Sequence, residues 1–141
     1  MENIVIIFTG IAGAITTYLV NNNLQQGAVR ASAGLSLLVG LFFYFFPHIL
    51  NPYLSHHIPI VFIGASFIGM VSEKILSHYF LIALSGCVFA IIYLNTSKFF
   101  DGYGGALGTT ASIAILVAIS LSIVSENKHI KRLRNFRKKN K

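Results

Sequence analysis

A glycine-rich segment with two threonines is the part of this sequence best suited to binding chemistry. Four glycines fall within seven residues and two threonines follow, namely Gly102, Gly104, Gly105, Gly108, Thr109 and Thr110. Each glycine costs a helix roughly 1 kcal/mol relative to alanine, so a regular helix is not expected to begin cleanly here. A broken or re-entrant helix start leaves N–H groups unpaired and directs the positive end of the helix dipole outward. The segment therefore predicts a site for an anion or a substrate carboxylate, with the threonine hydroxyls as further donors.

Two residues elsewhere complete the predicted substrate-binding set. Ser66 lies among the small residues Gly64, Ala65 and Gly69, and Arg30 stands at the start of another apolar run. An arginine at that place could reach an anionic group, or its side chain could extend to lipid headgroups. Water or neighbouring hydroxyls could also satisfy the glycine-rich segment without any substrate. The predicted set is Gly104, Gly105, Gly108, Thr109, Thr110, Ser66 and Arg30.

Catalytic, metal and cofactor motifs are not found in the sequence. The four acidic residues lie in separate loops or ends, at Glu2, Glu73, Asp101 and Glu126, so no pair of carboxylates stands at working distance. The glycines are not followed by the Lys-Ser/Thr pair of a phosphate-binding loop. The adjacent His56 and His57 point their rings in different directions on any regular element, and Cys87 is the one cysteine. We therefore expect no enzyme activity, no bound metal and no cofactor.

The composition indicates a membrane protein. Of the 141 residues, 55% are hydrophobic and only 11% are charged, and the mean hydropathy is +0.71. A soluble domain is about a quarter charged, so this chain could not cover a water-facing surface. Contiguous apolar runs exclude an outer-membrane barrel, whose strands alternate apolar and polar residues. An all-helical integral membrane protein is expected.

Five apolar runs predict about five transmembrane helices. The runs cover residues 4–20, 33–46, 58–71, 79–94 and 105–124. Because a spanning helix needs about twenty residues, the second and third runs are short, and four spans remain the alternative. The first run follows an acidic leader, Met1-Glu2-Asn3, and is not expected to be a secretory signal.

The basic residues predict the topology. Eight of the eleven lysines and arginines lie at the end of the chain, at Lys128, Lys131, Arg132, Arg134, Arg137, Lys138, Lys139 and Lys141. Positively charged segments beside a span are retained in the cytoplasm, so we expect the C-terminus inside and the N-terminus outside. The expected organisation is a transmembrane domain over residues 1–125 and a basic cytoplasmic tail over 126–141, in the inner membrane. The tail is suited to anionic lipid headgroups, and no nucleic-acid partner is expected.

An internal repeat is suggested by alignment of the first two runs with the last two. Gly10 meets Gly86 and Ala14 meets Ala90; after a shift of one residue, Gly27 meets Gly104, Ala31 meets Gly108, Ser32 meets Thr109 and Gly34 meets Ala111. The matched residues are mostly small, and small residues are common in every membrane helix. If the repeat is real, its copies start three helices apart and cross the membrane in opposite directions. Such an inverted repeat is found in many transporters.

Small and hydroxyl residues recur along three of the runs. Ser32, Ser36 and Gly40 are spaced by four, as are Gly104, Gly108 and Ser112, while Gly64 to Gly69 cluster in the third run. Spacing by four places residues on one helix face, and small faces let helix backbones approach closely. We expect a small transport or permeation protein that acts as a homo-oligomer. The alternative is a membrane subunit without transport activity that packs in a larger complex.

Overall fold

The computed structural model describes residues 1–76, 78–96 and 104–139, with side-chain surroundings for all of these except Gly104 and residues 126–139. The described chain forms five helices and no strands: α1 Glu2–Asn22, α2 Ala28–Phe45, α3 Pro52–Gly69, α4 Tyr79–Thr96 and α5 Gly104–Lys139. The all-helical class and the five helices predicted from the apolar runs are confirmed.

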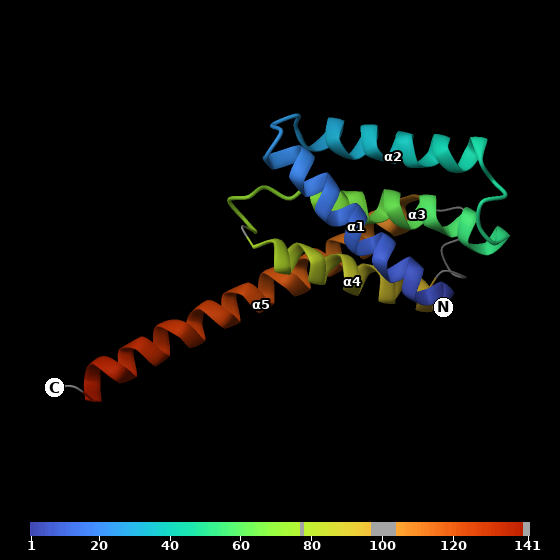
Figure 1. The fold of residues 1–141 in the computed structure, drawn as a ribbon. Helices are drawn as coiled ribbons and strands as arrows, with labels where there is room; N and C mark the ends of the chain where they lie inside the picture. The colour runs from blue at the N-terminus through green and yellow to red at the C-terminus, as the bar shows by residue number, and fades with distance from the viewer. Residues whose placement is uncertain (77, 97–103, 140–141) are drawn as a thin grey trace.

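The helices alternate in direction along the bundle. α1 runs from the N-terminal end to the opposite end, α2 returns, and each later helix reverses again (Figure 1). The N-terminus and the far end of α5 therefore lie at opposite ends of the molecule (Figure 1). The α1–α2 and α3–α4 connections share one end, and the α2–α3 turn lies at the other.

Four of the described helices are long and apolar enough to cross a membrane. They are α1, α2, α4 and the part of α5 from Gly105 to Ser125, with mean hydropathy between 1.6 and 2.2. α3 is not among them, because Pro52, His56, His57 and Pro59 dilute its apolar residues.

α3 is the central helix of the bundle. It packs against all four of the others, whereas the described parts of α2 and α5 do not touch each other. Half of its residues are buried, including Val61, Ala65 and Ile68. A helix surrounded by other helices does not need an apolar surface all round, so α3 can carry these polar residues although half of it is buried.

Glycines allow the three inner helices to approach closely. A Cβ atom at Gly69 of α3 would lie 2.5 Å from the Cβ of Thr17 and 2.6 Å from the carbonyl oxygen of Ala14, both on α1. At the crossing of α1 and α4, a Cβ on Gly10 would lie 2.8 Å from the Gly86 oxygen, and a Cβ on Gly86 would lie 2.6 Å from the Gly10 oxygen. Real Cβ atoms do not approach other atoms so closely, so only glycine fits at these positions.

Polar side chains at the end of α1 hold the end of α3. The Asn21 amide donates to the carbonyl oxygen of Met70 at 3.2 Å, and the Asn22 amide donates to that of Val71 at 3.2 Å. The buried hydroxyl of Tyr18 donates to the Leu76 carbonyl at 2.7 Å. The two asparagine bonds pair carbonyls just after the last residue of α3, and the tyrosine bond holds the segment that follows against α1.

α2 and α5 lie at the outside of the bundle. Only Ala31 and Ser32 of α2 are buried, and Leu37, Leu38, Phe42 and Phe45 are exposed. The described α5 continues to Lys139 without a break at residue 125, where we expected the tail to begin. Lys98 and Asp101, two of the few charged residues that precede the basic tail, lie outside the described residues.

Candidate functional site

Three serines form a hydrogen-bonded cluster between α2 and α3. Ser32 and Ser36 share one face of α2 because they are four residues apart. The Ser32 and Ser66 hydroxyl oxygens are 2.6 Å apart, and the Ser36 hydroxyl donates to the Ser66 oxygen at 3.3 Å. Ser32 is 3% exposed and Ser66 is fully buried. Some residues of the predicted site could form hydrogen bonds to another helix. Among such bonds in the described structure, those of this serine cluster are the most buried.

Replacing Ser66 with alanine should remove the common partner of the other two serines. The buried Ser32 hydroxyl would then lose its interhelical bond, at a cost of about 1–3 kcal/mol for an unsatisfied buried group. Ser36→Ala, at a half-buried position with the longer bond, is the matched control and should cost less than half as much. Thermal unfolding of the purified protein, followed by circular dichroism, measures both. Equal stability of the two variants would mean that Ser66 is not the common hydrogen-bond partner of the other two serines.

A buried threonine on α1 lacks any hydrogen-bond partner. Thr17 is fully buried, and its hydroxyl oxygen has no partner in the described structure. Its Cβ abuts Gly69, which lies three residues beyond Ser66 on α3. No sequence signal distinguished Thr17 from Thr16, whose hydroxyl donates to the Ala12 carbonyl at 2.7 Å. Sequence reasoning therefore missed this residue.

The glycine-rich segment does not produce the helix break that we expected within the described residues. α5 is helical from Gly104 onward, through Gly105 and Gly108. Glycine is tolerated in membrane helices more readily than in soluble ones, which accounts for the regular backbone. Gly102 and Tyr103, at the beginning of the predicted segment, lie outside the described residues.

The two threonines of α5 bond to their own helix. The Thr109 hydroxyl donates to the Ala106 carbonyl at 2.9 Å, and the Thr110 hydroxyl donates to the same carbonyl. Each hydroxyl has only one proton, so neither is a free donor as the sequence suggested. A Cβ atom at Gly105 or Gly108 would meet nothing within 4 Å. The described part of the chain therefore gives no packing reason for these two glycines.

The predicted residues occupy two separate places. Ser66 is joined to Ser32 on α2, and Arg30 lies two residues before Ser32 with its side chain exposed. No hydrogen bond among the described residues connects Ser66 with Thr109 or Thr110. The predicted site is thus divided between the α2–α3 contact and the start of α5.

An aromatic and histidine cluster lies near the α2–α3 turn. The His57 Nδ1 atom and the Tyr93 hydroxyl are 2.7 Å apart, and the Tyr53 ring centroid lies 4.2 Å from that of His57. This contact ties α3 to α4, and the sequence did not suggest it. Within the described residues, no three His, Cys, Asp or Glu side chains come together as a metal site.

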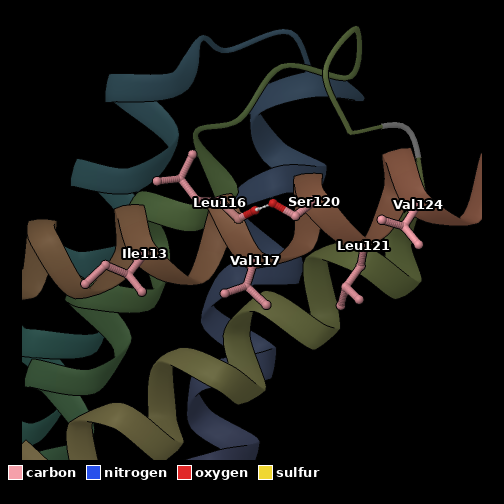
Figure 2. Close-up of a pocket in the computed structure, with 6 residues that line it drawn as sticks. All are labelled: Ile113, Leu116, Val117, Ser120, Leu121 and Val124. Carbon is pink, nitrogen blue, oxygen red and sulfur yellow. Dashed lines mark hydrogen bonds between the residues drawn. The ribbon is translucent and has the colours of Figure 1, made fainter.

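Among the surface hollows outlined by described residues, two are lined by neither Ser66 nor Thr109. One is a shallow apolar groove on α5, where the Ser120 hydroxyl donates to the Leu116 carbonyl at 2.8 Å (Figure 2). Its lining is Ile113, Leu116, Val117, Ser120, Leu121 and Val124. The other lies at the α2–α3 turn and is lined partly by His48, Asn51 and His56.

Comparison with known proteins found no matching family model, no matching curated protein and no matching solved structure.

Proposed function

We propose that the chain is a multi-pass membrane protein that transports a small polar solute, or lets it permeate, as a homo-oligomer. The observation that carries the proposal is the crossing of α1 and α4. The two helices run in opposite directions (Figure 1), and Gly10 and Gly86 face each other there through reciprocal backbone contacts.

This crossing supports an inverted repeat. Gly10 and Gly86 are equivalent positions in the sequence alignment of α1–α2 with α4–α5. Two units related by a two-fold axis in the membrane plane bring equivalent residues together where that axis passes between them. The Ala90 Cβ lies 3.0 Å from where a Cβ on Gly10 would be, so a second aligned position takes part in the contact. Inverted units of this kind are the common plan of membrane transporters.

The serine cluster supports a polar route beside the central helix. Hydroxyl groups are costly in an apolar interior unless they are paired, and here they pair with one another between helices. α3 would stand between the two inverted units, with α2 and α5 on either side. A second copy of the chain would cover the faces of α2 and α5 that are exposed in a single copy.

Solute flux into proteoliposomes tests the proposal. Vesicles containing the purified protein should take up small neutral and ionic solutes faster than protein-free vesicles of the same lipid, as followed by light scattering after an osmotic step. Ser36→Leu, which places a large apolar side chain beside the serine cluster, should slow the uptake, whereas Leu38→Ala on the exposed face of α2 should not. Identical uptake with and without protein would refute the proposal.

The topology follows from the direction of the helices and from the charges. In the proposed arrangement α3 crosses the membrane together with the other four helices. Arg30 and Lys74 then lie at the same end of the bundle as the basic tail. We therefore expect the N-terminus outside and the C-terminus inside the inner membrane, with the tail at anionic headgroups. Reporter tags at each terminus, one active only in the cytoplasm and one only outside, measure this. Both termini on the same side would contradict five spans.

A membrane subunit without transport activity is the second candidate. It is favoured by the exposed apolar faces of α2 and α5 and by the open space around Gly105 and Gly108. In that case Gly105→Leu and Gly108→Leu should release a partner protein from the purified complex while Phe45→Leu retains it. No co-purifying partner, together with solute flux by the protein alone, would exclude this candidate.

A further inference from the structure

The hollow at the α2–α3 turn is large enough for a small molecule. Its volume is about 560 Å³, within the range of roughly 300–1,000 Å³ that is usual for ligand sites. Half of the residues that line it are apolar, including Phe43 on α2 and Leu50 in the turn. The other half are polar, namely His48, Asn51, Ser55 and His56. This lining suits a molecule that carries a polar group on an apolar body.

Hydrogen bonds hold the shape of this hollow. The Ser55 hydroxyl on α3 shares its proton between the carbonyl oxygens of Pro47 at 3.0 Å and Leu50 at 3.3 Å, both in the turn. The Asn51 amide donates to the Glu2 carboxylate at 3.3 Å and so ties the turn to α1. A site whose walls are already in place loses little free energy to ordering when a ligand binds. The hollow is therefore preformed.

Two histidines in the lining are not bonded to the rest of the described chain. Neither His48 nor His56 forms a hydrogen bond or an ion pair within the described residues, and the His56 ring only meets that of His57, with centroids 5.2 Å apart. His57 differs, because its Nδ1 atom lies 2.7 Å from the Tyr93 hydroxyl. A neutral imidazole has one N–H group and an imidazolium has two, so the rings of His48 and His56 can donate to a ligand in either state.

The other groups around the hollow favour a ligand with negative charge. Asn51 is the N-cap residue of α3, so the positive end of that helix borders the hollow. The Asn51 side chain makes no capping bond, and its amide has a second N–H beyond the one that bonds Glu2. Glu2 itself does not line the hollow, and no other acidic residue of the described chain does. The Ser55 proton is already used, so the donors left for a ligand are the two rings and this amide.

We infer that this hollow binds a phosphate group, carried by a small molecule or by a phospholipid, through the ring N–H groups of His48 and His56. A phosphate offers several oxygens in different directions and can accept from both rings and from Asn51, whereas a carboxylate offers only two oxygens in one plane. The apolar wall would contact the rest of the molecule. The inference goes beyond the proposed function and does not depend on it, because no residue of the serine cluster lines the hollow.

Thermal unfolding in phosphate tests the inference. The full-length protein in a neutral detergent is unfolded at rising sodium phosphate, with sodium chloride and sodium acetate of the same ionic strength and pH as references. A ligand that binds only the folded state raises the unfolding temperature as its concentration increases. We expect this rise for the natural sequence and for His78→Ala, which changes an exposed histidine that does not line the hollow. His48→Ala and His56→Ala should each need about tenfold more phosphate for the same rise, because each lacks one hydrogen bond to a charged group.

The variants separate binding from the general stabilising effect of phosphate salts. Because His48 and His56 are both exposed, their replacement should leave the fold intact. An equal rise in the natural sequence and in all three variants, or an equal rise in acetate, would overturn the site.

A matched pair of lipids distinguishes the two sources of phosphate. Short-chain phosphatidic acid and the diacylglycerol with the same chains differ only in the phosphate group, and each is added in place of sodium phosphate. Stabilisation by phosphatidic acid alone, weakened in His48→Ala and His56→Ala, would identify a phospholipid headgroup. Stabilisation by sodium phosphate as well would mean that a free phosphate group is sufficient. Equal stabilisation by the diacylglycerol, or no response to either source of phosphate, would overturn the inference.

Discussion

Gly69→Ala should be the most damaging alanine substitution among the glycines of this chain. The new Cβ would lie 2.5 Å from the Thr17 Cβ, 2.6 Å from the Ala14 oxygen and 2.7 Å from the Tyr18 nitrogen. Two of these atoms belong to the α1 backbone and cannot turn aside, so α1 and α3 must move apart. Overpacking of this kind costs about 3 kcal/mol. Chemical or thermal unfolding in detergent, compared with the natural sequence, measures the loss.

Gly34→Ala is the matched control for this prediction. Gly34 lies within α2, and a Cβ there would meet nothing within 4 Å. Alanine forms helices better than glycine by up to about 1 kcal/mol, so this variant should be as stable as the natural sequence or more so. If Gly69→Ala proved as stable as Gly34→Ala, the close contact of α1 with α3 would be wrong.

Alanine at the α1–α4 crossing should have the second largest effect. In Gly86→Ala the Cβ would lie 2.6 Å from the Gly10 oxygen, and in Gly10→Ala it would lie 2.8 Å from the Gly86 oxygen. Each change must separate the two helices, at a cost of about 2–3 kcal/mol. The same unfolding measurement applies, with Gly40→Ala on α2 as the control with open space.

The double variant adds a sharper criterion. Once one alanine has separated α1 from α4, the second finds room, so the combined loss should be clearly smaller than the sum of the two single losses. Residues in contact show such coupling, whereas distant residues add. Strict additivity of Gly10→Ala and Gly86→Ala would mean that the two glycines do not meet, and the main support for the inverted repeat would be lost.

The sequence predicted the helices well where lipid would set their composition. The apolar runs at 4–20, 79–94 and 105–124 lie within α1, α4 and α5 to within a few residues. In the proposed membrane arrangement the exposed side chains of these helices would face lipid and so be apolar, which is why hydropathy alone reveals these helices. α2 begins at Ala28, five residues before its predicted run, because Gly27 at φ 86° ends the preceding turn and polar residues are acceptable at the helix start.

The start of α3 was predicted six residues too late. The helix begins at Pro52, and its first half includes the polar His56 and His57, so the apolar run was taken to begin only at residue 58. A proline in the first helical position is favourable, since the N–H that it lacks has no partner there. The polar residues are tolerated because they meet other helices, as the bond between His57 and Tyr93 illustrates. Hydropathy cannot recognise a helix that is shielded by its neighbours.

The candidate site was predictable only in part. The spacing of Ser32 and Ser36 indicated a shared face, and Ser66 was chosen, yet their mutual contact depends on how α2 docks on α3. The glycines of α5 led us to expect a broken helix, which the described residues from Gly104 onward do not show, because the cost of glycine was judged for a helix in water. Thr17 could not be found, since an unpaired hydroxyl is a property of packing and leaves no mark in the sequence.

Thiol accessibility in intact membranes shows whether a polar route runs between the helices. Cys87 is replaced by alanine, and single cysteines are placed at Ser36, Gly105, Thr109 and Leu38. A membrane-impermeant thiol reagent is then applied from each side. We expect labelling at Ser36 and along the Gly105–Thr109 face of α5. We expect none at Leu38, because this exposed apolar residue would face lipid. If Ser36 reacts no better than Leu38 from either side, water does not reach the contact between α2 and α3, and the chain does not form the proposed route.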